Sequence, residues 1–316
     1  MKLGILGCGQ LGKSLAGALR TTRFRPCVVV SRRLGSARLA SKLAGGCSYG
    51  TEPSLLVAAD AIVLCVPDDQ IATAVSDLVR GARQAAADLE TAEAGRRPAR
   101  GRSTHESRRA LAPVRPLAGR IVLHTSGVHS SAILGEAREA GAVVASFHPI
   151  QTFARVAPEL FRGIYFAIDG EEPALRFCRT LARALGARTL TIAPEARPLY
   201  HAALSIGCNF FQTIEWIASE LLEEARVKAP LRVIRPLLCS TLANLADVGF
   251  PQALTGPISR SDLETVRAHI EALERHRPEL ARLYRHVGRW TVGLAQLKGT
   301  ITPEGARRMR RLLREE

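Results

Sequence analysis

The chain has 316 residues, of which 47% are hydrophobic, and its formal net charge is +15 at pH 7. This length accommodates two domains of ordinary size, and the apolar content excludes a chain that is disordered throughout. No apolar run is long enough to indicate a membrane span, and no metal-ligand spacing occurs. The seven cysteines include no C-x-x-C pair. We expect a cytoplasmic protein with no signal peptide, no membrane partner and no metal.

The positive charge is distributed in a way that argues against a nucleic-acid-binding surface. Only five of the 44 basic residues are lysine, so arginine supplies most of the charge. The arginines gather in residues 95–116 and 307–314, and neither stretch carries the interleaved aromatic side chains that stack on bases. We expect a solvated loop and a solvated helix there, and no nucleic-acid partner.

The first expected strand, residues 2–7, runs into a glycine-rich turn that fits two phosphate-binding motifs. Residues 7–12 form the G-x-G-x-x-G fingerprint of dinucleotide-binding folds, and residues 7–14 also form G-x-x-x-x-G-K-S, the P-loop of nucleoside-triphosphate-binding proteins. In both cases a helix N-terminus offers N–H groups and a positive dipole to phosphate. The expected cofactor-binding residues of this turn are Gly7, Gly9, Gln10, Leu11 and Gly12.

A second apolar strand is expected at residues 26–31 and runs into Ser31, Arg32 and Arg33. In a dinucleotide-binding fold this position meets the adenosine ribose, and an acidic residue there would bind the 2′-hydroxyl of NAD. A hydroxyl and two guanidiniums suit a 2′-phosphate instead, because arginine matches phosphate oxygens bidentately. The sequence therefore favours NADP (NADPH) as cofactor, although the arginines could simply begin a solvated helix.

The strand expected at residues 60–66 helps to decide between the dinucleotide fingerprint and the P-loop. A P-loop enzyme needs an apolar strand that ends in a metal-binding aspartate, but here Pro67 stands between Val66 and Asp68. Proline ends a strand and bends the chain, which shapes a nucleotide crevice better than it orients a magnesium ligand. We therefore favour the dinucleotide interpretation, keep the P-loop as a minor alternative, and assign Val66 and Pro67 to the cofactor site.

Apolar strands and helical patterns alternate over most of residues 1–192, as in βαβ units. We predict an α/β domain with a Rossmann-like doubly wound parallel sheet. Within it, residues 82–117 are arginine-rich and of low complexity, and we expect a mobile, dispensable insertion there. We predict that residues 193–316 form an all-helical substrate and dimerisation domain. The helix expected at 199–225 is apolar on most faces, so a homodimer partner would have to cover it.

Two expected strand ends carry a histidine and a hydroxyl where a nicotinamide and its substrate meet in an open parallel sheet. These segments are His-Thr-Ser-Gly at 124–127 and Ser-Phe-His-Pro at 146–149. A histidine at a strand end is often a structural group, but two such ends favour a functional role for one of them. We assign Ser126 to both cofactor and substrate binding, and His148 is a candidate proton donor.

Arg197, His201, Ser205 and Asn209 follow at intervals of four, so a helix would place them along one face. On an apolar helix such a stripe either lines a cleft or forms hydrogen bonds in the core, and we favour the cleft. His201 is the first candidate for proton transfer, because histidine titrates near neutral pH. Asn209 joins it as a catalytic candidate, and Ser205 is a candidate substrate ligand.

The segment Thr-Gly-Pro-Ile-Ser-Arg-Ser-Asp at 255–262 precedes another expected helix. Ser259 or Ser261 could cap that helix. The segment is therefore either a capped turn or part of the substrate site, in which Thr255 and Arg260 would be the ligands.

Together these motifs resemble a family of predicted oxidoreductases that join a Rossmann-like domain to domain of unknown function 2520. The resemblance covers the chain outside residues 82–117. It implies an NAD(P)-binding domain and a helical domain similar to those of ketopantoate and 6-phosphogluconate dehydrogenases. It rests on Gly-Cys-Gly-Gln-Leu-Gly, Val-Pro-Asp-Asp, His-Thr-Ser-Gly, Ser-Phe-His-Pro-Ile-Gln-Thr-Phe, Leu-Tyr-His-Ala-Ala with Asn209, and Leu-Thr-Gly-Pro-Ile-Ser-Arg.

Two departures from the related dehydrogenases bear on the chemistry. Ketopantoate and β-hydroxyacid dehydrogenases use a helix lysine followed four residues later by asparagine, whereas the matching helix here has Arg197 and His201 and no lysine. The Ser-Phe-His-Pro segment is similar instead to the His-Pro segment of prephenate dehydrogenases, whose histidine binds the reacting hydroxyl. In addition, Ser261 stands where the family usually has glycine.

The sequence therefore predicts an NADP-dependent oxidoreductase that transfers hydride between the nicotinamide and a small carbonyl compound or hydroxy acid. The resemblance suggests a 2-ketoacid such as ketopantoate as substrate, with a prephenate-like compound or an imine as the alternative. Outside enzymes, the missing helix lysine keeps open an NADP-binding sensor that has lost turnover.

Overall fold

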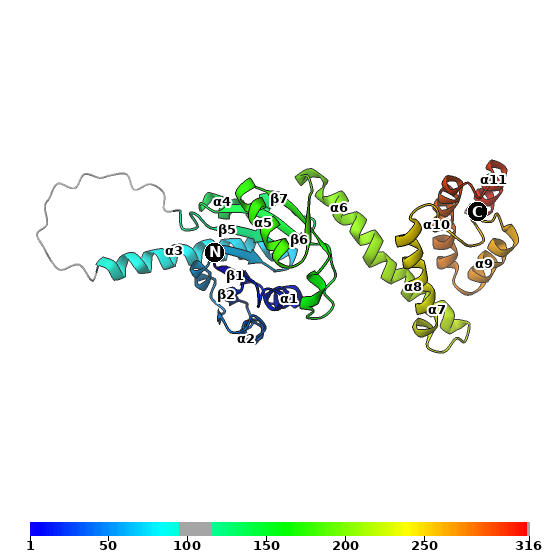
Figure 1. Ribbon diagram of the computed structural model, residues 1–316. Coiled ribbons are helices and arrows are strands. Elements are labelled where there is room, and N and C mark those ends of the chain that lie inside the picture. The colour runs from blue at the N-terminus through cyan, green and yellow to red at the C-terminus, as the bar shows by residue number, and fades with distance from the viewer. Residues whose placement is uncertain (95–114, 315–316) are drawn as a thin grey trace, which may run out of the picture. The chain divides into compact units, whose positions relative to one another are not determined.

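The computed structural model describes residues 1–94 and 115–314. Contacts divide the chain into two compact units, Met1–Phe211 and Gln212–Glu316. The first unit contains an eight-stranded sheet with the strand order β3-β2-β1-β4-β5-β6-β7-β8 (Figure 1). The strands are β1 (Leu3–Leu6), β2 (Pro26–Val30), β3 (Ser48–Gly50), β4 (Ala61–Leu64), β5 (Ile121–His124), β6 (Val143–Pro149), β7 (Tyr165–Gly170) and β8 (Arg188–Thr191).

The predicted parallel sheet is confirmed for the six strands from β3 to β6, which run parallel to their neighbours. The pairing of β6 with β7 is antiparallel, which the sequence analysis did not predict. Residues 150–164 between them contain a single short 3₁₀ turn, Pro158–Phe161, and no α-helix that would carry the chain back across the sheet. β8 then runs parallel to β7.

Helices cover both faces of this sheet, as the doubly wound prediction requires. One face packs against α1 and α5 in a core that includes Leu15, Phe147 and Leu181. The other face packs against α3 and α4 in a second core that includes Ile62 and Leu78. The helices of this region are α1 (Gln10–Ala18), α2 (Leu34–Leu43), α3 (Ile71–Ala94), α4 (Gly135–Glu139) and α5 (Glu172–Ala184).

Both predicted boundaries of the insertion, residues 82 and 117, are wrong. α3 continues to Ala94, and Ala82 packs in the second core. The residues after Ala82 include many alanines, and alanine has the highest helix propensity, so this sequence extends the helix. At the other end Leu117 is fully buried, and its N–H donates to the Ala140 carbonyl at 2.9 Å. Residues 95–114 lie outside the described residues, so for them the prediction stays untested.

The long helix predicted at 199–225 is composed of α6 (Arg197–Leu204), a π-helical turn (Ser205–Phe210) and α7 (Phe211–Glu224). α6 belongs to the first compact unit, and the predicted domain boundary at residues 192–193 stays a prediction. The second unit continues with α8 (Pro230–Val248), α9 (Leu263–His276), α10 (Pro278–Lys298) and α11 (Pro303–Leu312). α9, α10 and α11 enclose a small core that includes Val266, Val292 and Met309.

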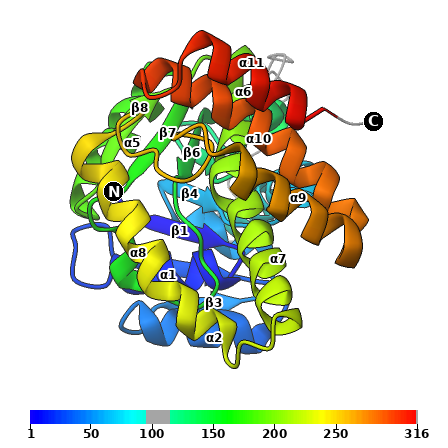
Figure 2. The same cartoon turned by 90° about the vertical axis from the view of Figure 1, so that its right-hand side faces the viewer.

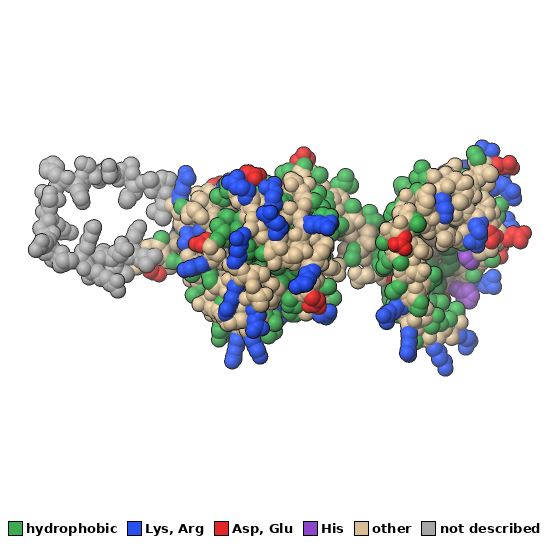
Figure 3. Space-filling model, viewed as in Figure 1, with side chains coloured by type: hydrophobic (Ala, Val, Ile, Leu, Met, Phe, Trp, Pro, Cys, Tyr) green, Lys and Arg blue, Asp and Glu red, His purple; other side chains and the backbone are tan. Residues whose placement is uncertain are grey.

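α7 and α8 differ from these core helices, because almost none of their side chains is buried. No residue of α7 is buried, and Pro230 alone is buried in α8. Figure 2 shows the ribbons of these two helices. No described helix is both long and apolar enough to cross a membrane. On the face of the first unit in Figure 3, lysine and arginine side chains are scattered rather than gathered in one patch.

Candidate functional site

The glycine-rich turn connects β1 to α1, as its motif predicts. Gly7 has a φ of +98°, and a Cβ at this position would lie 2.4 Å from the Cys65 carbonyl oxygen. A Cβ on Gly12 would lie 1.9 Å from the Gly7 carbonyl oxygen. The fold therefore requires glycine at both positions. A Cβ on Gly9 would meet no described atom within 4 Å, so glycine there suits the close approach of a ligand instead.

The N-terminus of α1 is open towards a ligand. α1 begins at Gln10 with Gly9 as its N-cap, no described side chain caps it, and its first turn contains no acidic residue. The first N–H groups of a helix have no partner within the helix, and the helix dipole adds positive charge there. This turn therefore fits the pyrophosphate of a dinucleotide, held by backbone groups of Gln10, Leu11 and Gly12.

The same geometry does not support the P-loop alternative. Ser14, which would bind Mg²⁺ in a P-loop, is fully buried: its hydroxyl donates to the Gln10 carbonyl at 2.7 Å and accepts the Ala157 N–H at 2.9 Å. The helix also begins only three residues after Gly7, which leaves a short turn rather than a loop that could surround a triphosphate.

The other predicted cofactor residues follow β2 and β4 at the same edge of the sheet, because β1, β2 and β4 are parallel. Ser31 is half-buried, whereas Arg32 and Arg33 are exposed, and Arg33 is the N-cap of α2. Neither guanidinium forms a hydrogen bond or ion pair within the described parts of the chain, so both are available to a phosphate. Val66 is half-buried and Pro67 is exposed.

His124, at the end of β5, has a structural role. It is fully buried, its Nδ1 accepts the Ser126 N–H at 3.1 Å, and its Nε2 lies 3.1 Å from the Ser130 carbonyl, to which it donates. Burial lowers the pKa of His124 to about 4, so the ring is neutral at pH 7. Ser126 is buried too, and its hydroxyl accepts the His129 N–H at 3.2 Å. The predicted contact of Ser126 with a ligand stays a prediction.

The second strand end brings the two predicted proton donors together. The rings of His148 on β6 and His201 on α6 pack edge to face, with centroids 6.0 Å apart. Gly127 lies against both: a Cβ there would be 2.8 Å from His148 Nε2 and 2.5 Å from His201 Cδ2. His148 Nδ1 lies 2.8 Å from the hydroxyl oxygen of Tyr200. Tyr200 is not among the predicted site residues, although its position directly before His201 was an available signal.

His148 and Tyr200 are both neutral at pH 7. Burial lowers the pKa of His148 to about 4, and the nearby positive charge of Arg197 adds to this shift. Burial also raises the pKa of Tyr200 to about 12. The general expectation that a histidine titrates near neutral pH therefore does not hold for His148.

Arg197 anchors α6 to the sheet. It is fully buried, and its Nε lies 2.5 Å from Asp169 Oδ2 on β7, an ion-pair contact whose angle departs from that of a hydrogen bond. Its other nitrogens donate to the carbonyls of Ser126 (3.3 Å), Gly127 (3.4 Å) and Ala167 (3.3 Å). The prediction that this polar stripe lines a cleft is therefore wrong for Arg197. Arg197 forms its hydrogen bonds in the core, where its charge neutralises buried Asp169.

The remaining predicted residues lie further along the chain. Ser205 is half-buried and Asn209 exposed, and both lie in the π-helical turn, whose wider winding interrupts the stripe expected of an α-helix. Thr255 and Arg260 are exposed in the second unit. The substrate or catalytic roles of these four residues stay predictions.

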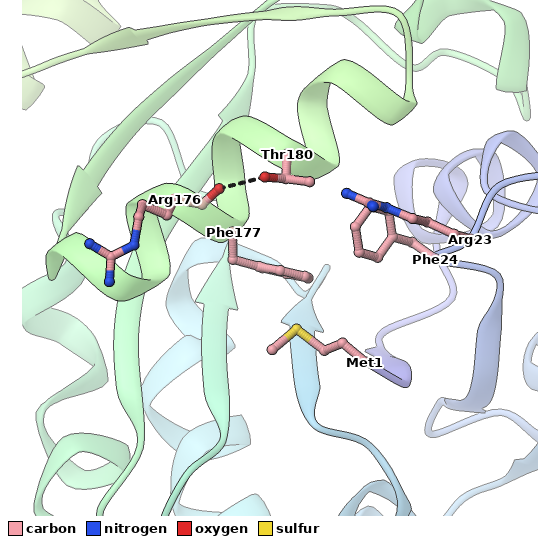
Figure 4. A pocket seen from close by; sticks show the side chains of 6 residues that line it. All are labelled: Met1, Arg23, Phe24, Arg176, Phe177 and Thr180. Atoms are coloured by element: carbon pink, nitrogen blue, oxygen red, sulfur yellow. Dashed lines mark hydrogen bonds between the residues drawn. The ribbon is translucent and has the colours of Figure 1, made fainter.

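A cavity of about 380 Å³ lies elsewhere on the first unit (Figure 4). Met1 precedes β1, so this cavity is near the amino ends of the strands, whereas nucleotide sites of such sheets lie beyond the carboxyl ends. It is therefore separate from the candidate site. Its lining residues are Met1, Arg23, Phe24, Arg176, Phe177 and Thr180.

Two family models match the chain. Residues 2–87 match the family described as NADP oxidoreductase, coenzyme F420-dependent, and residues 164–291 match domain of unknown function 2520. The predicted resemblance is confirmed. The chain is thus similar to NADP oxidoreductases over residues 2–87 and to domain of unknown function 2520 over residues 164–291. No curated protein matches it at a significant level.

Solved structures share this fold. A protein of Bacteroides fragilis assigned as an NADP oxidoreductase is 24% identical, with a TM-score of 0.68 over 92% of this chain and 97% of that one. A protein of Thermotoga maritima is 21% identical, with a TM-score of 0.67 over 94% and 99%. A reductive aminase of Aspergillus terreus, solved with NADPH and ethyl-5-oxohexanoate, is 15% identical, with a TM-score of 0.53 over 99% and 92%. These similarities confirm the predicted fold class.

Proposed function

We propose that this protein is an NADP-dependent oxidoreductase that acts on a small carbonyl compound, imine or hydroxy acid. One observation carries the proposal: the phosphate-binding turn after β1 and the His148 end of β6 belong to one set of parallel strands with a common carboxyl edge. In such sheets the nucleotide and its substrate meet at that edge. When bound, the cofactor supplies or accepts the hydride. The histidine pair would hold the reacting oxygen or nitrogen and supply its proton.

The preference for NADP over NAD is tested at Arg32 and Arg33. Each charge-assisted hydrogen bond to the 2′-phosphate is worth about 1.5–3 kcal/mol, so replacing both arginines by alanine is expected to raise the Kd for NADPH by roughly 100- to 10,000-fold. The Kd for NADH should not change. Arg38→Ala, which removes another exposed arginine of α2, is the matched control. Fluorescence titration measures both constants, and equal affinity of the native protein for NADH and NADPH would contradict the proposal.

For proton transfer we propose His201. His148, the second candidate from the sequence, is neutral at pH 7 and would act as a hydrogen-bond donor instead. His201→Asn is expected to lower turnover by roughly 100-fold or more if His201 is the general acid. Binding of NADPH serves as the control for folding, and an unchanged rate in a folded variant would contradict the role of His201.

The substrate can be identified by measuring the oxidation of NADPH in the presence of each compound of a panel. Ketopantoate and other 2-ketoacids come first, on analogy with the helical domain of ketopantoate dehydrogenases. Prephenate-like compounds and ketone–amine mixtures follow, the latter because a reductive aminase shares the fold. Tight NADPH binding without oxidation of NADPH by any compound would favour the sensor alternative.

We further propose that the second unit forms a homodimer. α7 and α8 are apolar, yet Pro230 is the one residue of the two helices that is buried, and isolated helices of this length are only marginally stable in water. Exposed apolar patches of this kind mark interaction surfaces. The large exposed side chains on the two helices include Ile214, Trp216, Leu231, Val233, Leu237, Leu242 and Val248.

A further inference from the structure

The hydrogen bond between Tyr200 and His148 is the feature from which we draw a further inference. The two side chains come from α6 and β6, and their rings pack edge to face, with centroids 5.8 Å apart. The Tyr200 hydroxyl oxygen lies 2.8 Å from His148 Nδ1. One proton lies between these atoms, and its position decides which nitrogen of His148 carries the ring proton.

Acidity indicates that Tyr200 is the donor. A neutral imidazole carries one N–H and one bare nitrogen, and a phenolic O–H is a stronger donor than an imidazole N–H. The bare nitrogen is in turn a better acceptor than a phenol oxygen. Tyr200 therefore donates to Nδ1, and the ring proton of His148 is on Nε2.

The groups around His148 favour the neutral ring. Tyr200 and His201 contact it directly, and buried Arg197 and His124 are close enough to lower the pKa of His148. The buried carboxylate of Asp169 is already paired with Arg197. An imidazolium at His148 would be partly desolvated and would face the positive charge of Arg197, which disfavours it.

His148 Nε2 lies close to the backbone of Gly127. A Cβ on Gly127 would lie 2.8 Å from this nitrogen, and the φ of Gly127 is outside the left-handed region. The backbone dihedral angles therefore do not require glycine at this position, and glycine is needed because the two imidazole rings approach its Cα so closely. His148 Nε2 has no hydrogen-bond partner among the residues that the structure describes.

We propose that Tyr200 is a positioning residue that fixes His148 as the neutral Nε2–H tautomer, and that this N–H binds an acceptor atom of the substrate beside Gly127. The tautomer follows from the contact between Tyr200 and His148 and from the relative acidity of the two groups, whereas the substrate contact rests on the proposed function. A neutral N–H donor selects substrates whose reacting carbon carries a lone-pair atom, a carbonyl oxygen or an imine nitrogen. His148 would then orient and polarise that atom without being an imidazolium.

The tautomer is measured by two-dimensional ¹H–¹⁵N NMR of protein with ¹⁵N-labelled histidine at pH 7, with His148→Gln used to assign the signals. We expect His148 to show a protonated Nε2 and a bare, hydrogen-bonded Nδ1. Tyr200→Phe keeps the ring but removes the donor, so a mixture of tautomers is expected. Tyr284→Phe is the matched control, because Tyr284 bonds His269 Nδ1 in the same way at 3.0 Å in the second unit. It should leave the His148 signals unchanged.

A proton on Nδ1 in the native protein, or an unchanged His148 spectrum in Tyr200→Phe, would overturn the inference. With any active compound of the panel, Tyr200→Phe should lower turnover roughly 10-fold, at the lower end of the effect of removing the partner of a metal-binding histidine. Its Kd for NADPH should not change. If the tautomer is as expected but no compound is turned over, the positioning role stands and the proposed enzymatic function fails.

Discussion

Buried His124 and half-buried His148 make the stability of the fold depend on pH. His124 and His148 have pKa values of about 4 in the folded chain, against 6.5 for an unperturbed histidine. Between these values the unfolded chain binds protons that the folded chain does not, so stability falls as the pH drops from about 6.5 to about 4. For fully buried His124 the loss approaches about 3 kcal/mol.

Urea unfolding at pH 7, 6 and 5 measures this dependence, and the unfolding midpoint should decrease with pH. His124→Asn is expected to flatten the dependence, whereas His276→Asn, which removes an exposed histidine, should leave it intact. A midpoint that stays constant from pH 7 to pH 5 would show that the two rings accept protons within the fold.

Ser14 distinguishes the two phosphate-binding interpretations at the level of one hydroxyl. Ser14→Ala leaves the buried N–H of Ala157 without its acceptor, so we expect a loss of about 1–3 kcal/mol of stability and an unchanged Kd for NADPH. Ser36→Ala, on α2, is the control. A stable Ser14→Ala variant that had lost Mg²⁺-dependent ATP binding would restore the P-loop interpretation.

At the scale of secondary structure, local sequence predicted the elements well where pattern and turn chemistry agree. The glycine turn, the parallel strands and the histidines at the ends of β5 and β6 all follow from residues close in sequence. The extension of α3 did not, because an alanine-rich helix and a low-complexity loop have similar compositions. Nor did the hydrogen bonds of Arg197 in the core, which depend on Asp169 on a distant strand.

Leu117 packs in the core that also contains α3, so a substitution at Leu117 tests where the predicted insertion ends. Leu117 is fully buried in the core of α3 and β5, so Leu117→Ala is expected to cost about 2–5 kcal/mol in chemical unfolding. Leu39→Ala, on α2, removes a side chain that is 45% exposed and should cost far less. If the two variants were equally stable, residue 117 would belong to a dispensable insertion after all.

For the whole molecule the open question is what covers α7 and α8. We expect sedimentation to give the mass of a dimer, and Leu237→Asp on α8, where the side chain is 65% exposed, to shift the population towards monomer. A charge buried in an apolar interface without a partner carries a large desolvation cost. Leu39→Asp, in the first unit, is the control and should leave the mass unchanged. A native protein that sediments as a monomer at micromolar concentration would disprove the homodimer.

The pairing of Asp169 with Arg197 also constrains how this chain can change over generations. Replacing either residue alone leaves an uncompensated buried charge, at a cost of about 3–5 kcal/mol, whereas an apolar pair of similar volume can be neutral. Such a loss is a large part of the roughly 5–15 kcal/mol by which a typical domain is stable. Asp169 and Arg197 are therefore expected to be replaced together or not at all. A related protein with another residue at position 201 is expected to keep this ion pair, because the pair holds α6 on the sheet.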